Sequence, residues 1–277
     1  MSLTAFLKHN RDVREAFSKQ FRKPDFREQK PLAAPPLTNE WSPVGTAFDY
    51  LLRFIVEQLN PGLAKSWPWV AEVEWELIGP DKELESKRSH ILSETRRQLQ
   101  DYLRTGVLKD EMLRSALLLA PLDSIARVDR GYEDLGNFNQ RDVQDLRNLA
   151  QLVDAKLFKA KTTCLLNPTF GKDSLLDADA DLVIDDMIID VKVTKKLSLE
   201  RSYMDQLLGY YVLHQLHGIG GLEARPPINR LAIYFARHGY LYVFNPLQLM
   251  QTAELDASLR WFKERAEANA SIWDAKP

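Results

Sequence analysis

Residues 181–192, which read D-L-V-I-D-D-M-I-I-D-V-K, hold two short apolar runs separated by a pair of aspartates. The runs, residues 182–184 and 187–189, consist of residue types that are frequent in strands. Asp185 and Asp186 between them are typical of a tight turn. The stretch therefore predicts a two-stranded β-hairpin.

The second arm of this hairpin separates polar from apolar side chains. Side chains alternate between the two faces of a strand, so Asp190 and Lys192 are expected on one face and Val191 on the other, with the core. Asp181 stands directly before the first apolar run and adds a second carboxylate. Asp179 has the same strand parity as Asp181 and is the alternative choice for this carboxylate.

An acidic residue two positions before a lysine is weak evidence by itself. The chain has four further examples, Glu28 with Lys30, Glu85 with Lys87, Asp154 with Lys156, and Asp274 with Lys276. Only the pair Asp190 and Lys192 lies in an apolar, strand-forming run. The structural alternative is an exposed aspartate and lysine that pair across a sheet.

Two carboxylates and a lysine suit the hydrolysis of a phosphodiester bond. That reaction needs a divalent cation held by oxygen ligands, an activated water molecule, and positive charge near the phosphate in the transition state. Asp181, Asp190 and the carbonyl oxygen of Val191 are the candidate metal ligands. Lys192 would orient the attacking water or stabilise transition-state charge. The expected cofactor is Mg²⁺, with Mn²⁺ as a substitute.

Residues 202–218 have the periodicity of a helix. Gln206 and Tyr210 are four residues apart and share one face of it, and His214 extends the same stripe. This helix would place polar groups beside the hairpin. The alternative interpretation is an ordinary amphipathic helix with tyrosines at its interface.

Together, Asp181, Asp190-Val191-Lys192, Gln206 and Tyr210 resemble the PD-(D/E)XK nuclease superfamily, particularly its RecB-like branch, over about residues 163–245. The resemblance implies a restriction-endonuclease-like fold, and cleavage of DNA or sometimes RNA with Mg²⁺. It also implies that Asp181 and Asp190 bind metal, that Lys192 is catalytic, and that Gln206 and Tyr210 are an auxiliary pair on the following helix. Phage defence, repair and mobile-element biology are the roles that it suggests.

RecB-like members also carry a glycine followed four residues later by a histidine on an early helix. Gly45 and Asp49 have this spacing, with aspartate in place of histidine. Asp49 would add a third carboxylate ligand for Mg²⁺. The alternative is a surface aspartate near a helix start, where negative charge favours the helix dipole.

Composition is typical of an intracellular enzyme. The chain has 277 residues, of which 45% are hydrophobic, and a single cysteine, Cys164, which excludes an internal disulfide. No run of ~18 apolar residues and no signal-like leader is present, so we expect a cytoplasmic protein with no membrane segment. A protein partner or a homo-oligomer is compatible with the sequence.

The net charge of −2 argues against a broad nucleic-acid-binding coat, so contacts with DNA would come from local basic patches. The candidates are Lys156, Lys159, Lys161, Lys172, Lys195, Lys196 and Arg201. For each of them alone, a solvated surface position is the alternative.

The resemblance implies a mixed central sheet flanked by helices, and with it the remaining sequence predicts an α/β (α+β) fold that has a large N-terminal helical region. We expect three sequence regions: residues 1–44, a helix and a proline-rich arm; 45–160, mostly helical; and 161–277, the core that carries the hairpin. Expected helices are 4–20, 48–59, 84–103, 109–119, 141–157 and 255–268, with a Trp-rich segment at 67–75 and an irregular arm from Pro24 to Pro43. Residues 166–171 are interpreted as a loop, with a strand end as the alternative, and residues 231–236 and 240–244 as a second hairpin.

The sequence thus predicts a Mg²⁺-dependent deoxyribonuclease. The alternative function is a catalytically silent subunit that keeps the fold for nucleic-acid binding or assembly.

Overall fold

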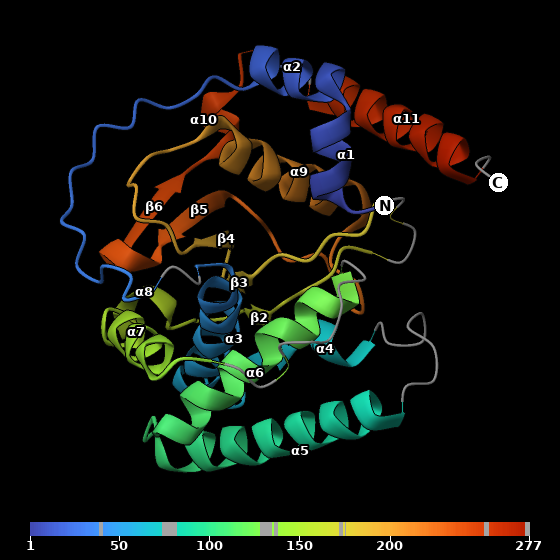
Figure 1. Cartoon of the computed structure of the whole chain (residues 1–277). Helices are drawn as coiled ribbons and strands as arrows, with labels where there is room; N and C mark the ends of the chain where they lie inside the picture. Colours follow the sequence, from blue (N-terminus) through green and yellow to red (C-terminus); the bar gives the residue numbers. More distant parts are fainter. Residues whose placement is uncertain are drawn as a thin grey trace.

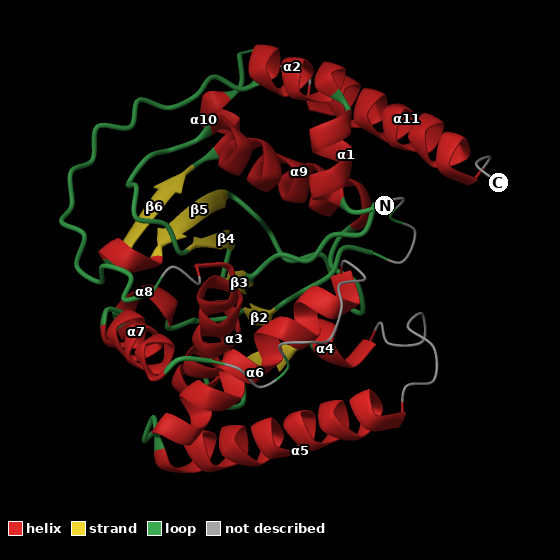
Figure 2. Cartoon of the chain, in the orientation of Figure 1, coloured by secondary structure: helices red, strands yellow, loops and turns green. Residues whose placement is uncertain are grey.

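The computed structural model describes residues 1–38, 41–73, 82–127, 135, 138–171, 174, 176–251 and 255–274. Within these residues, a mixed sheet of six strands lies between two layers of helices (Figures 1 and 2). The strands are β1 (Ala64–Ser66), β2 (Cys164–Leu166), β3 (Leu182–Ile184), β4 (Met187–Lys192), β5 (Arg230–Phe235) and β6 (Tyr240–Phe244). They follow this order across the sheet; the pairs β1–β2 and β4–β5 are parallel and the other pairs are antiparallel.

The helices form one layer on each side of the sheet (Figure 1). The first layer contains α3 (Trp41–Leu59), α4 (Val70–Val73), α5 (Lys82–Thr105), α6 (Asp110–Arg127), α7 (Gln140–Gln151) and α8 (Ala155–Phe158). The second contains α1 (Leu3–His9), α2 (Arg11–Gln20), α9 (Arg201–His217), α10 (Pro246–Leu249) and α11 (Leu255–Asp274). A short 3-10 helix, η2 (Ala236–His238), joins β5 to β6. None of the helices in the described ranges is long and apolar enough to cross a membrane.

Each layer has its own hydrophobic core, and the side chains of the strands point alternately into one core and the other. Ile184 and Ile189 pack into the core under α3, whereas Val183 and Ile188 pack into the core under α9. Val191 also packs against the α3 side. The predicted separation of faces is therefore confirmed, and it leaves the even-numbered residues of the end of β4 on the α9 side.

The predicted hairpin is confirmed, with Asp185 and Asp186 as its turn. Asp185 adopts the left-handed region with φ of 53°, which aspartate tolerates better than most residues. Its carboxylate accepts hydrogen bonds from the backbone N–H groups of Lys161, Thr162 and Thr163. The turn is thus fixed by the segment that leads into β2.

The predicted arm lacks helix and strand between residues 22 and 38 and runs along the β6 side of the molecule (Figure 1). Phe26 attaches it to the sheet through ring contacts with Phe235 and Tyr242, at centroid distances of 5.8 and 4.9 Å. Pro43 does not break the chain as predicted but lies in the first turn of α3. Proline is tolerated there because the first N–H groups of a helix have no intrahelical partner.

Several predicted boundaries were wrong. The helix expected at 4–20 is two helices, because Asn10 adopts an extended backbone, with φ of −109°, and its amide donates to the carbonyl of Phe6. The helix expected at 141–157 ends at Gln151, and a separate turn, α8, follows. Strand β1 was not predicted. The Trp-rich segment is helical only over α4, and residues 74 and 75 lie outside the described ranges.

Candidate active site

The antiparallel ladder of the hairpin ends at the pair Leu182 and Ile189. One step further in the same register, Asp181 would face Asp190. Residues opposite each other in such a ladder have Cβ atoms roughly 4.5–5.5 Å apart, on the same face. The Asp181 carboxylate also accepts a hydrogen bond of 2.6 Å from the backbone N–H of Val191. The two carboxylates predicted from sequence are therefore brought together at the point where β3 ends and β4 continues.

The loop before β3 keeps the same alignment with β2. Cys164 pairs with Ile184, and an isolated bridge between Thr169 and Asp179 falls on the same register. Residues 166–171 are thus neither a free loop nor a full strand, but an interrupted continuation of β2. This continuation holds the segment that leads to Asp181 in place.

Lys192 links the hairpin to α9. Its ammonium nitrogen Nζ lies 2.8 Å from Oδ2 of Asp190 and donates to Oε1 of Gln206 at 3.0 Å. The amide of Gln206 then donates to the hydroxyl oxygen of Tyr210 at 2.7 Å. The Tyr210 ring is stacked on Phe170, with centroids 5.5 Å apart. The predicted residues of the strand and of the helix therefore form one continuous polar chain.

Sequence reasoning missed Tyr203, which also faces this chain. Its ring centroid lies 5.0 Å from Nζ of Lys192, a distance typical of a cation–π contact. Tyr203, Gln206 and Tyr210 follow each other at spacings of three and four residues, so they form one stripe on α9. Extending the predicted stripe one turn toward the start of the helix would have found Tyr203. His214, at the other end of the stripe, is buried, and its ring nitrogen Nδ1 lies 3.4 Å from the amide of Gln215.

Asp49 approaches from the other layer. The start of α3 contacts the end of β4, because a Cβ built on Gly45 would lie 4.0 Å from that of Val193. Asp49 is one helical turn further along, and its Oδ2 forms an ion pair of 2.9 Å with Arg53. Arg53, which sequence reasoning also missed, stands four residues after Asp49, the usual spacing of a helical ion pair.

Burial and like charge dominate the electrostatics of the two opposed carboxylates. Burial, followed by the negative charges of Asp49 and Asp190, raises the pKa of Asp181 well above its ordinary value. Burial also raises the pKa of Asp190, although Lys192 opposes the shift. Burial alone would lower the pKa of Lys192, but the neighbouring carboxylates outweigh it and raise that pKa. The site therefore disfavours ionisation of the two carboxylates and favours the cationic form of Lys192.

The donor set fits a hard divalent cation. Asp181 and Asp190 offer carboxylate oxygens, the ligand type that Mg²⁺ prefers, and Mg²⁺ commonly takes only one or two carboxylates from a protein. The N–H and C=O of one strand residue point to the same edge, so the carbonyl of Val191 faces the edge where its N–H meets Asp181. In the described ranges, no three His, Cys, Asp or Glu side chains form a metal-holding group.

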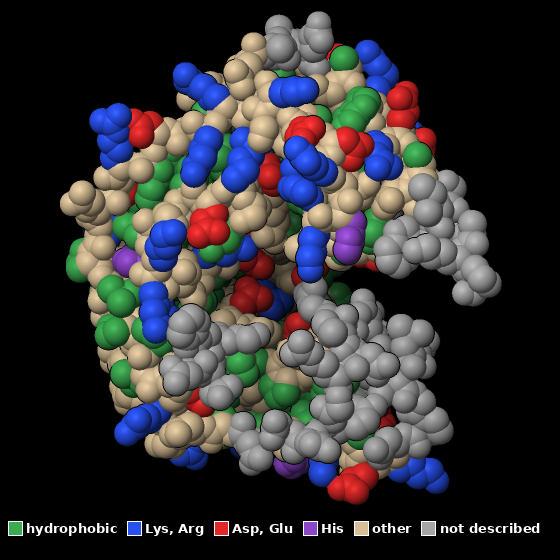
Figure 3. Space-filling view, turned by 45° about the horizontal axis from the view of Figure 1, so that its top comes forward, with side chains coloured by type: hydrophobic (Ala, Val, Ile, Leu, Met, Phe, Trp, Pro, Cys, Tyr) green, Lys and Arg blue, Asp and Glu red, His purple; other side chains and the backbone are tan. Residues whose placement is uncertain are grey.

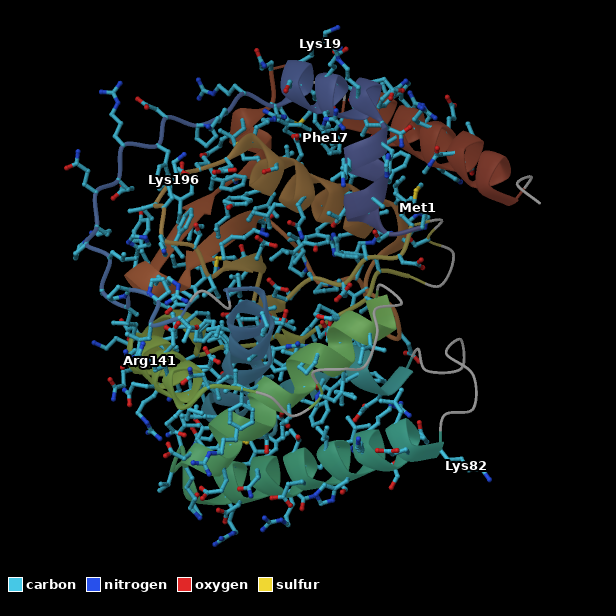
Figure 4. All side chains as sticks on the ribbon, in the orientation of Figure 1. Met1, Phe17, Lys19, Lys82, Arg141 and Lys196 are labelled. Atoms are coloured by element: carbon cyan, nitrogen blue, oxygen red, sulfur yellow. The ribbon has the colours of Figure 1, made fainter. Side chains whose placement is uncertain are left out.

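Asp179 stands two residues before Asp181. Burial raises the pKa of Tyr210, and the charges of Asp190, Asp181 and Asp179, in that order, raise it further. Among the predicted basic residues, Lys195 and Lys196 are exposed on the loop between β4 and α9, where Figure 4 labels Lys196. Arg201 instead pairs with Asp205 at 2.8 Å. Lys172 lies outside the described residues.

The surface is hollowed beside the sheet. Figure 3 shows acidic and basic side chains at the floor of this hollow and Lys or Arg side chains on its rim. Two cavities are lined by other residues, one by α2, α9 and α11 and the other by the arm and residues 197–199.

Comparison of the chain with family models, curated proteins and solved structures found no match. The case for a function therefore rests on the geometry of these residues.

Proposed function

We propose that this protein is a metal-dependent nuclease of the PD-(D/E)XK type, with a restriction-endonuclease-like core, that hydrolyses phosphodiester bonds. The observation that carries the proposal is that the Asp181 carboxylate accepts from the backbone N–H of Val191, directly between Asp190 and Lys192, while the Lys192 ammonium contacts the Asp190 carboxylate. A coincidental acidic pair would have no reason to meet at the end of a strand with a lysine and a polar helix face beside it.

Mg²⁺ bound at this site would polarise the scissile phosphate and lower the pKa of a water molecule. Asp181, Asp190 and the carbonyl of Val191 would hold the ion. Burial of the two carboxylates favours this role, because a divalent cation offsets the cost of their negative charge in a poorly solvated place.

Lys192 acts in this proposal as a fixed positive charge. As an ammonium group it would orient water or stabilise the phosphate in the transition state. Gln206 accepts one of its three N–H groups and Asp190 contacts the ammonium from another side. Tyr210 holds Gln206 in turn, so the helix fixes the direction of the lysine.

DNA is the proposed substrate, in preference to RNA. The exposed Lys195 and Lys196 follow the catalytic strand and are suited to contact a phosphate backbone, and the chain has no general excess of positive charge. Defence, repair or mobile-element biology is the corresponding proposal for its role.

The test is cleavage of linear, circular and single-stranded DNA and of RNA with Mg²⁺, Mn²⁺ or EDTA. Lys192→Met, which removes the charge and keeps the length, should lower the cleavage rate by about 10²–10³-fold. Lys8→Met, which removes an exposed lysine of α1, is the matched control and should keep most of the activity. Thermal melting checks that both variants fold.

Equal cleavage by the wild type and Lys192→Met would refute the assignment of Lys192. No cleavage of any substrate with any metal, together with tight binding of nucleic acid, would favour the catalytically silent binding or assembly subunit.

A further inference from the structure

Arg53 brings a second fixed positive charge to the proposed metal site. Only 5% of this residue is exposed. Its Nη2 donates to Oδ2 of Asp49 at 2.9 Å, and its Nε donates to the backbone carbonyl of Asp49 at 3.2 Å. The guanidinium carbon lies 4.3 Å from the centroid of the Tyr50 ring. The guanidinium is therefore held by an ion pair and by an aromatic ring.

Tyr50 is itself anchored, because its hydroxyl donates to Asp123 at 2.9 Å. This bond connects Arg53 to α6 and limits its movement. One guanidinium nitrogen, Nη1, is buried and has no hydrogen-bond partner among the described residues. A buried donor of this kind is costly unless something accepts from it.

The pair Asp49 and Arg53 lies beside Asp181. The start of α3 contacts the end of β4, and the charges of Asp49 and Arg53 both interact with that of Asp181. The charges of Asp49 and Asp190 thus both act on Asp181.

Charge sets how many metal ions this arrangement accepts. The three carboxylates Asp49, Asp181 and Asp190 face the two fixed cations Arg53 and Lys192, which leaves one net negative charge. In two-metal sites the ions lie roughly 3.5–4 Å apart, and they commonly share a bridging carboxylate. Here Asp181 would be the bridge and Asp49 the outer ligand of the second ion, but Arg53 already occupies Asp49.

We propose that Arg53 stands in for a second metal ion, so that the site binds one divalent cation between Asp181 and Asp190. This inference rests on the proposed function and deepens it. The charge of the guanidinium, which acts on Asp181, takes the place of the charge of a second ion.

The experiment is a titration with Mn²⁺ alone, in which electron paramagnetic resonance counts the ions bound per chain. The wild type should bind one ion, and Asp181→Asn should lose it. Arg53→Gln should bind two, because the ion pair of Arg53 with Asp49 and one positive charge are removed. Arg53→Lys, which keeps the charge, should bind one, and the double variant Arg53→Gln with Asp49→Asn should return to one.

Two ions bound by the wild type, or one ion still bound by folded Arg53→Gln, would overturn the inference. If Arg53→Gln does not fold, Asp49→Asn decides: it should still bind one ion, and loss of binding would show that Asp49 is a ligand. DNA cleavage, measured on the same protein samples, separates the two proposals. If the wild type binds two ions and cleaves DNA with metal, the nuclease proposal is kept and the proposed role of Arg53 is wrong. A wild type that binds no ion would overturn both.

Discussion

Two aspartates of the same hairpin should respond in opposite directions when their charge is removed. Asp181 faces two other carboxylates and receives one hydrogen bond, from Val191. Burial alone would raise the pKa of Asp185, but the N–H donors of three backbone groups outweigh it and lower that pKa. The native fold therefore disfavours the charge of Asp181 and favours that of Asp185.

The magnitude follows from the neighbours. Two like charges about 5 Å apart repel by roughly 3 kcal/mol at an effective dielectric constant of about 20, and Lys192 offsets part of this at Asp181. Asp181→Asn keeps an oxygen for the N–H of Val191, so without metal it should raise the free energy of unfolding by about 1–3 kcal/mol. Asp185→Asn tolerates the same backbone but weakens charge-assisted hydrogen bonds, and should lower the free energy of unfolding by about 1–2 kcal/mol.

Urea denaturation followed by circular dichroism, at neutral pH in EDTA, measures both values. Adding Mg²⁺ at ten times its dissociation constant should stabilise the wild type by about 1.4 kcal/mol and leave Asp181→Asn nearly unchanged. A loss of stability in Asp181→Asn as large as that in Asp185→Asn would refute the reasoning, because the fold would then need the charge of Asp181 for its own structure.

Three further outcomes are expected. Burial, followed by the charge of a nearby arginine, lowers the pKa of His214 from 6.5 to about 4. The native state therefore holds the neutral imidazole, so the free energy of unfolding is highest above pH ~6.5 and falls by about 3 kcal/mol as the pH drops toward ~4. Urea denaturation across this pH range measures the fall, which should be smaller in His214→Gln. The buried residues Arg237 and Asp145 pair through two contacts of 2.8 and 3.0 Å. Asp145→Asn should lower the free energy of unfolding by about 3 kcal/mol and lower the thermal midpoint. An unchanged midpoint would contradict a structural role for the pair. A Cβ at Gly171 would lie 2.4 Å from the backbone carbonyl oxygen of His217. Gly171→Ala should therefore lower the free energy of unfolding, measured by urea denaturation, by about 1–3 kcal/mol. An unchanged value would mean that the backbone at His217 moves to accept the methyl group at little cost.

The local sequence pattern was sufficient to predict the hairpin and the faces on which Asp190, Lys192, Gln206 and Tyr210 lie. Asp190 and Lys192 share a face because strand side chains alternate, and Gln206 and Tyr210 share a face because helical residues four apart align. Both relations hold within one element. The mixed α/β class, with a central sheet flanked by helices, was also predicted and is confirmed.

Contacts between segments that are distant in the chain could not be predicted from the sequence. Arg53 was missed because its importance depends on the contact between α3 and the end of β4, which no short sequence window contains. Strand β1 has three residues, A-K-S, without apolar alternation, and it is a strand only because it pairs with β2 a hundred residues later. Phe170 was missed as a site residue because it supports Tyr210 from a segment that sequence predicted to be a loop.

The parallel pairing of β1 with β2 has a consequence for how this chain can be divided and changed. About a hundred residues leave the sheet after β1, form α4 to α8, and return to the neighbouring strand. A fragment that starts at residue 161 would lose this edge strand and the α3 layer, and the apolar side chains of Leu166 and Ile184 would face water. Insertions within the excursion, by contrast, leave both ends of the pairing in place. Folding of the hairpin region should therefore wait for the N-terminal half of the chain, which makes its assembly a long-range and comparatively slow event.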